Sequence, residues 1–160
     1  MSDVNSPTND GQAGQVGPVA RTLGFAGLLP QFATLWFAWR GGDGFGQLLA
    51  FVYAAVILSF LGGMWWAFAM RRGPGQGVLV AISVVPSLVA FFLTVALAMN
   101  MISGRTALIS LGVAVIASLP VDQRLFRTGE VPRGWIALRV PLSVGLGVLT
   151  ILAGLAPPPQ

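Results

Sequence analysis

Hydrophobic and polar positions divide the chain into a polar N-terminal segment, five apolar stretches and short polar connections. The apolar stretches cover residues 23–39, 46–68, 78–98, 106–121 and 136–155. A helix needs roughly 20 residues to cross about 30 Å of hydrocarbon, because each residue advances it by about 1.5 Å. The second, third and fifth stretches meet this length, whereas the first and fourth are marginal. The pattern predicts an all-α fold, a multi-pass transmembrane helix bundle of about five short spans, with four spans as the alternative.

The two ends of the chain read differently from its middle. Residues 1–21 are polar and rich in Gly, Asn, Ser and Pro, a composition that favours a disordered polar N-terminal tail. Residues 1–20 contain no basic residue, which speaks against a secretory signal or a transit peptide. We expect a transmembrane helical domain over residues 22–156 and a short C-terminal tail over residues 157–160.

Composition leads to the same class of protein. Hydrophobic residues make up 55% of the chain and charged residues only 9%, whereas a soluble domain carries about 25% charged residues. The positively charged residues are all arginines and lie beside the apolar stretches, so we interpret them as topology signals and lipid-headgroup contacts. We therefore expect membrane lipids as partners and no nucleic acid.

The arginines also predict an orientation. Because the chain reverses at every span, its N-terminal side, second connection and fourth connection share one face. That face carries six arginines, namely Arg21, Arg71, Arg72, Arg124, Arg127 and Arg133. The opposite face carries only Arg40 and Arg105, so the positive-inside rule predicts a cytoplasmic N-terminus. Aromatic belts are expected at the outer interface from Trp36 and Trp39, and at the inner interface from Trp65, Trp66 and Trp135.

Small residues form a stripe along the second apolar stretch. Helix association in lipid depends on close backbone approach, which small side chains permit. The stripe has four-residue spacing and is widened by one further glycine; its residues are Ala55, Ser59, Gly62, Gly63 and Ala67. We interpret it as a helix-packing surface. Packing within the chain is one alternative, and a seam for a second copy or another membrane protein is the other.

Two ionisable residues come within reach of the membrane interior. Asp122 closes the fourth stretch, and Arg139 lies about one helical turn into the fifth, on the same side of the membrane. They are candidates for an interhelical ion pair, and the alternative is that Arg139 snorkels to the surface alone.

The chain lacks several of the residue types that catalyse reactions in enzymes. The chain has no cysteine and no histidine, which excludes disulfides and nearly every zinc site. Ser59 has no histidine or lysine to act as its base. We expect no catalytic residue, no cofactor and no metal, and thus no enzyme.

Three prolines inside the apolar stretches suggest a transporter as an alternative function. Pro30, Pro86 and Pro141 lie inside the first, third and fifth stretches, and transporters use broken helices to expose backbone groups to a substrate. The alternative is a kink whose freed groups are satisfied by neighbouring serine or threonine side chains. Gln31 and Thr34, in the middle of the first stretch, are expected to join interhelical hydrogen bonds.

Five segments, taken in order, carry a resemblance to a known family. They read LGFAGLLP from Leu23, YAAVILSFLGG from Tyr53, SVVPS from Ser83, DQRL from Asp122 and WIALR from Trp135. In that order they resemble the domain of unknown function 3429 family, multi-pass membrane proteins of bacteria that are also seen as the mitochondrial transmembrane protein 69 group. The resemblance runs from about residue 22 to residue 155, and ILSFLGG is its most specific part.

The resemblance implies an architecture and no activity. Such family members often place His or Arg where this chain has Trp65, so any proton or anion role of that basic residue does not carry over. Because a basic transit peptide is missing, the bacterial members of the family are the better match. We therefore expect the protein in the bacterial inner (plasma) membrane.

Two functions remain as hypotheses. The first is a small inner-membrane accessory or assembly subunit that acts by helix packing. The second is a small transporter or channel that uses its proline-broken helices. A water-accessible cavity lined by Gln31, Thr34, Ser59 and Ser87 would favour transport, whereas a dry core with an exposed small-residue groove would favour the accessory role.

Overall fold

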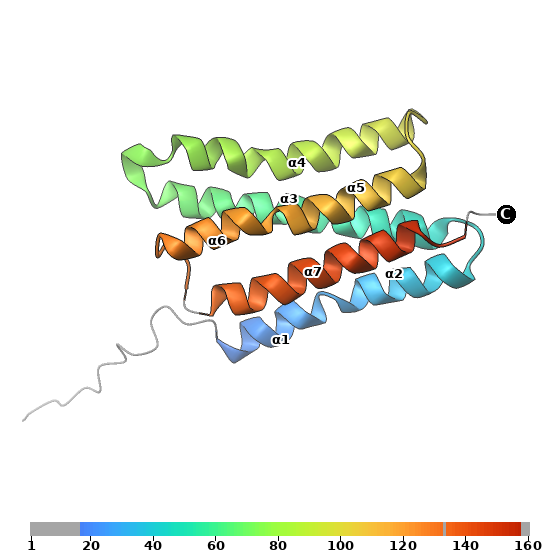
Figure 1. Ribbon diagram of the computed structural model, residues 1–160, viewed down its shortest axis with the longest axis horizontal. Helices are drawn as coiled ribbons and strands as arrows, with labels where there is room; N and C mark the ends of the chain where they lie inside the picture. Colours follow the sequence, from blue (N-terminus) through green and yellow to red (C-terminus); the bar gives the residue numbers. More distant parts are fainter. Residues whose placement is uncertain (1–16, 133, 158–160) are drawn as a thin grey trace, which may run out of the picture.

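The computed structural model of the chain describes residues 17–132 and 134–157, and the regular elements of this part are all helices (Figure 1). In chain order they are α1 (Pro18–Ala26), α2 (Leu29–Arg40), α3 (Phe45–Met70), the short 3-10 turn η1 (Gly73–Gly75), α4 (Gly77–Ala98), α5 (Gly104–Ala117), α6 (Leu119–Arg127) and α7 (Trp135–Gly154). They pack side by side as an up-and-down bundle, so the predicted all-α multi-pass fold is confirmed.

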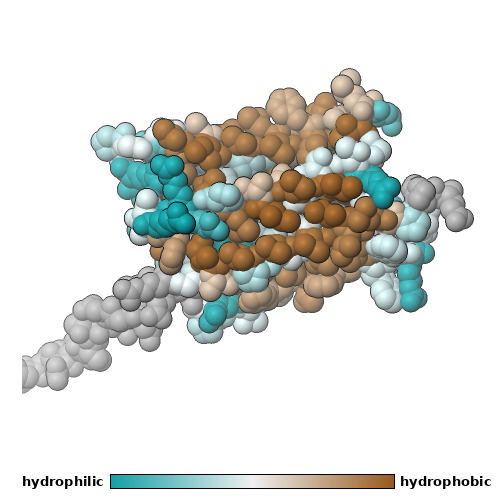
Figure 2. All heavy atoms as spheres, in the orientation of Figure 1, coloured by the Kyte–Doolittle hydropathy of each residue, from teal (hydrophilic) through white to brown (hydrophobic). Residues whose placement is uncertain are grey.

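Within residues 17–132 and 134–157, four helices are long and apolar enough to cross a membrane. They are α3, α4, the combined α5–α6 run over Gly104–Arg127, and α7. Figure 2 shows hydrophobic residues covering the middle of the visible face and hydrophilic residues gathered at its two ends, as a membrane protein requires. The first predicted span is divided into α1 and α2, which together run along α7 from one end of the bundle towards the other (Figure 1). A fifth crossing by this pair stays a prediction.

The break between α1 and α2 has a local cause. Pro30 has no backbone N–H and disfavours helical conformation in the residue before it, so a helix tends to end ahead of it. The backbone N–H of Gly27 closes α1 by bonding to the carbonyls of Leu23 and Gly24, at 3.0 and 3.1 Å. The carbonyl of Gly27 accepts a hydrogen bond from the hydroxyl of Tyr53 on α3. One carbonyl at the break, that of Gly27, is thus satisfied within the protein, as an apolar surrounding demands.

A milder interruption separates α5 from α6. Pro120 follows Ser118, whose hydroxyl donates to the carbonyl of Val115 at 2.7 Å. The run nevertheless continues in one direction to Arg127, so the fourth stretch extends well beyond its apolar part. This extension carries Asp122 alongside α7.

The connections alternate between the two ends of the bundle. The start of α1, the α3–α4 turn and the α6–α7 connection lie at one end, at the left of Figure 1. We call it the arginine-rich end, after its described arginines Arg21, Arg71, Arg72, Arg124 and Arg127. Arg133 lies outside the described residues. The α2–α3 and α4–α5 connections, with Arg40 and Arg105, lie at the opposite end.

Glycines set the closest helix contacts. A Cβ atom on Gly62 of α3 would overlap the carbonyl oxygen of Ser83 on α4 and touch the ring of Pro86 at 3.4 Å. A Cβ on Gly112 of α5 would lie 2.6 Å from the carbonyl oxygen of Gly147 on α7, and one on Gly147 would lie 2.8 Å from that of Gly112. Both seams therefore require glycine, which is the way helices gain dispersion contacts in lipid.

The predicted small-residue stripe is only partly buried. Gly62 is buried, whereas Ala55 and Ser59 are half-buried and Gly63 and Ala67 are exposed. Of the two alternatives for the stripe, packing within the chain therefore does not apply to Gly63 and Ala67. A step of four residues overshoots a full turn by about 40°, so three steps carry the stripe about 120° around the helix and away from α4.

The predicted domain boundaries differ from the structure in one respect. Residues 18–21 already belong to α1, so helix begins before the expected start at residue 22. Residues 1–16, which hold most of the predicted tail, and residues 158–160 lie outside the described residues.

Candidate functional site

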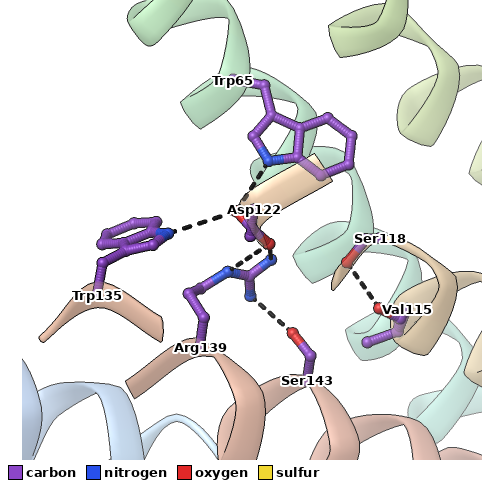
Figure 3. A network of polar contacts seen from close by, with 7 residues as sticks. All are labelled: Trp65, Val115, Ser118, Asp122, Trp135, Arg139 and Ser143. Carbon is purple, nitrogen blue, oxygen red and sulfur yellow. Dashed lines mark hydrogen bonds and ion pairs between the residues drawn. The ribbon is translucent and has the colours of Figure 1, made fainter. Parts of the chain in front are cut away.

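A buried ion pair joins α6 to α7 near the arginine-rich end. Asp122 lies in the first turn of α6 and is fully buried, and Arg139 lies in the second turn of α7 with 5% of its surface exposed. Arg139 donates from Nε and Nη2 to the same carboxylate oxygen, Oδ2 of Asp122, at 3.0 and 2.7 Å (Figure 3). The chain places the two residues on neighbouring antiparallel helices, because only a short connection follows α6.

Two tryptophans complete the environment of the carboxylate. The indole N–H of Trp65 on α3 donates to Oδ1 of Asp122 at 3.1 Å, and that of Trp135 approaches the same oxygen at 3.5 Å (Figure 3). Trp65 is only 2% exposed, so its predicted place in an interfacial belt is wrong. Trp135 is half-buried and packs edge-on against Phe68, with ring centroids 5.7 Å apart.

The guanidinium of Arg139 has a second partner in Ser143. Nη1 of Arg139 donates to the hydroxyl of Ser143, one turn further along α7, at 2.8 Å (Figure 3). Buried charges are costly unless they are paired and hydrogen-bonded, and here each carboxylate oxygen accepts two hydrogen bonds. The five-residue network of Trp65, Asp122, Trp135, Arg139 and Ser143 thus links α3, α6 and α7 and pairs the two buried charges with each other.

A second ion pair lies outside the spans at the same end. Arg72, just after α3, donates to both carboxylate oxygens of Glu130, one of these bonds being 2.6 Å from Nη2 to Oε1. The hydroxyl of Thr128 also donates to Glu130. The hydrogen bond from Arg72 holds the pKa of the Glu130 carboxyl below its usual value, and the same bond raises the pKa of Arg72. This pair fastens the α3–α4 connection to the α6–α7 connection.

A third polar cluster lies between α2 and α7. Gln31 is fully buried and donates from Nε2 to the hydroxyl of Thr150 at 3.0 Å, while Thr150 donates to the carbonyl of Leu146 at 2.7 Å. Thr34 donates back to the carbonyl of Gln31 at 2.9 Å. Oε1 of Gln31 is buried and accepts no hydrogen bond from the described residues. The interhelical partner, Thr150, was not singled out from the sequence, because a threonine in an apolar stretch bonds equally well to its own helix.

No cluster of metal-ligating side chains lies in the part of the chain that the structure describes. Within residues 17–132 and 134–157, no three Asp or Glu side chains gather closely enough to hold an ion.

Comparison with known proteins identifies the family. The family model described as Protein of unknown function (DUF3429) matches residues 16–155. The chain belongs to this family. Neither a curated protein nor a solved structure gives a significant match. The family resemblance expected from the sequence is therefore confirmed. Because the function of the family is unknown, membership assigns no activity to this chain.

The residues that would line a transport pathway do not come together in this DUF3429 protein. Gln31 and Thr34 are buried beside α7, Ser59 is half-buried on α3, and Ser87 is exposed on α4. Helices α2 and α4 lie on opposite sides of the bundle (Figure 1). The four residues therefore do not line one shared cavity.

Proposed function

We propose that this DUF3429 protein is an accessory or assembly subunit of a bacterial inner membrane that acts by helix packing and has no enzymatic activity. The observation that carries the proposal is the position of Gly63, which is exposed at the centre of an open face of α3. A Cβ atom built on Gly63 meets nothing within 4 Å.

The open face has the shape that a second helix requires. We define it by its small residues Ala55, Ser59, Gly63 and Ala67. Bulky exposed side chains flank these small ones, among them Val56, Phe60 and Trp66, at 59%, 60% and 45% exposure. A depression of this kind lets another transmembrane helix bring its backbone close, which is the main source of association energy in lipid. We propose that its occupant is a transmembrane helix of another membrane protein.

The interior supports a structural role. The buried charges of Asp122 and Arg139 pair with each other. Asp122 also accepts hydrogen bonds from two indoles, and Arg139 donates one to Ser143. One backbone carbonyl at the α1–α2 break, that of Gly27, accepts a hydrogen bond from Tyr53. A transporter would expose such charges to a water-filled pathway for its substrate, whereas Asp122 and Arg139 are buried. We further propose that the arginine-rich end faces the cytoplasm, on the positive-inside rule.

Crosslinking from the open face tests the proposal. The chain contains no cysteine, so a single introduced thiol is unique. We expect Gly63→Cys, labelled with a thiol-reactive benzophenone and irradiated in its own membranes, to give one discrete heavier adduct. The matched control is Val113→Cys on α5, an exposed position at 53% exposure that should give none.

Three outcomes decide between the alternatives. The proposal is supported if the Gly63→Cys protein gives a discrete adduct and the same protein with Ala67→Leu added gives none. An adduct of twice the 16.7 kDa chain mass would replace the foreign partner with a second copy. If the thiol reacts fully with an apolar maleimide and yet gives no adduct, α3 faces lipid and the proposal is wrong.

A further inference from the structure

A lateral cleft opens between α1, α3 and α7 and has a polar floor. Helix α1 leans on α7, where Gly24 allows close approach: a Cβ there would lie 3.1 Å from the side chain of Leu142. The resulting cavity measures about 420 Å³ between α1 and α3. Its lining includes Leu23 and Phe60, which are 67% and 60% exposed and form its mouth. The cleft therefore opens sideways, where the bilayer would lie.

The floor of the cleft exposes part of the buried network. Arg139 and Ser143 both line it, although they are only 5% and 1% exposed. A guanidinium carries five N–H groups. Three of those of Arg139 are used, two on Asp122 and one on Ser143. One hydrogen on each of Nη1 and Nη2 has no acceptor among the described residues.

Charge and shape together define the ligand. Asp122 neutralises Arg139, so the floor attracts a neutral acceptor such as a carbonyl oxygen more than an anion. The remaining lining is apolar and continues along α7 as far as Leu146, about 10 Å from Arg139 at about 1.5 Å per residue. Cavities of about 300–1,000 Å³ with a few convergent polar groups are typical of ligand sites.

Depth favours an acyl lipid. Trp135 lies one turn before Arg139 at the start of α7, and interfacial tryptophans lie at headgroup level. Arg139 is thus at the depth just below the headgroups, where ester carbonyls of bilayer lipids lie. We infer that the cleft binds one ester lipid from the bilayer, its carbonyl accepting hydrogen bonds from Arg139 and its acyl chain lying against Leu142 and Leu146. This site adjoins the open face of α3 at Phe60, but it does not depend on the function proposed for that face.

Photolabelling in vesicles tests the site. The full chain is reconstituted in vesicles of ether-linked phosphatidylcholine, which has no ester carbonyl, with a small and varied fraction of ester-linked phosphatidylcholine that carries a diazirine in its acyl chain. Labelled peptides are mapped by mass spectrometry. We expect saturable labelling of α1 and α7 around Gly24 and Leu142. Leu142→Trp, which fills the cleft, should reduce this labelling about tenfold, equivalent to about 1.4 kcal/mol of lost binding. Val144→Trp, on an outward position at 39% exposure, should leave it unchanged.

Two further measurements keep the result interpretable. Met64→Trp fills the cleft from the α3 wall and should match Leu142→Trp, while the thermal unfolding midpoints show which variants are folded. Equal labelling in the Leu142→Trp and Val144→Trp proteins, both folded, would overturn the site. Labelling that a short-chain benzoquinone displaces, but excess unlabelled ester-linked phosphatidylcholine does not, would overturn the ester lipid as its occupant.

Discussion

The indole nitrogen of Trp65 and the carboxylate of Asp122 are 57 positions apart in sequence and 3.1 Å apart in space. This bond ties α3 to the α6–α7 ion pair, so three helices meet at one buried carboxylate. The adjacent residue Trp66 is 45% exposed and has no part in the network, although the two tryptophans are indistinguishable by residue type.

Replacing Trp65 by phenylalanine removes one donor from Asp122 and keeps most of the apolar volume. We expect Trp65→Phe to lower the unfolding free energy by about 1–2 kcal/mol, since hydrogen bonds to charged groups are the stronger ones but lose value in bundles that can re-pair. Trp66→Phe is the matched control and should change little. Chemical unfolding in mild detergent measures both, and equal losses would contradict the role given to Trp65.

Adjacent glycines on α3 should respond in opposite ways. Gly62→Leu forces α4 away from α3, because even a Cβ there overlaps the carbonyl of Ser83, and overpacking of this kind costs about 1–3 kcal/mol. Gly63→Leu should leave the stability of the isolated protein unchanged, because nothing lies near that position. Thermal unfolding of the two variants in detergent compares them directly, and a larger loss at Gly63 would contradict the packing described for α3.

Replacing the two partners of the Gln31–Thr150 hydrogen bond should cost different amounts of stability. Thr150→Val leaves the amide of Gln31 buried with neither polar end paired, which we expect to cost about 1–3 kcal/mol. Gln31→Leu removes an unpaired oxygen and leaves Thr150 bonded to Leu146, so it should be nearly neutral. Unfolding free energies in detergent provide the measurement. The assignment fails if the glutamine variant is the less stable of the two.

The Arg72–Glu130 pair predicts a pH dependence with a definite sign. Glu130 has a lowered pKa in the folded protein, so the pair stabilises the fold above the ordinary carboxyl value of 4.5 and loses that contribution as the pH falls through the lower folded value. The effect should be small, under about 1 kcal/mol, because the pair is partly exposed. Comparing Glu130→Gln with the parent protein in thermal unfolding between pH 7 and pH 3 isolates it. Parallel curves over that range would show that the pair contributes nothing.

Much of the fold could be predicted from the sequence because hydrophobic length and arginine position report directly on helices in lipid. The alternation of connections between two ends follows from span count alone. What the sequence could not provide is the rotation of each helix. Gly62 and Gly63 both belong to the small-residue pattern, and only the direction from which α4 approaches decides which of them is buried. Trp65 was misplaced for the same reason.

The candidate site was partly accessible to sequence reasoning. Asp122 and Arg139 stood out because charges near helix ends in lipid are few, and their shared side of the membrane suggested a pair. Their partners did not stand out, since Ser143 and Trp135 resemble ordinary packing and interface residues. The Gly112–Gly147 seam was missed because α5 and α7 each contain more than one glycine, and the sequence does not show which of them face each other.

The central claim is that the Asp122–Arg139 pair holds the helices together, and a double-mutant cycle tests it most directly. Unfolding free energies in mild detergent are compared for Asp122→Ala, Arg139→Ala and the double variant, with Arg127→Ala on the same helix end as a control that should change little. Each single substitution leaves a buried charge uncompensated, which we expect to cost about 3–5 kcal/mol. The double variant should cost less than the sum by more than about 1 kcal/mol. Additive losses would contradict the pair and leave Arg139 as an independent anchor.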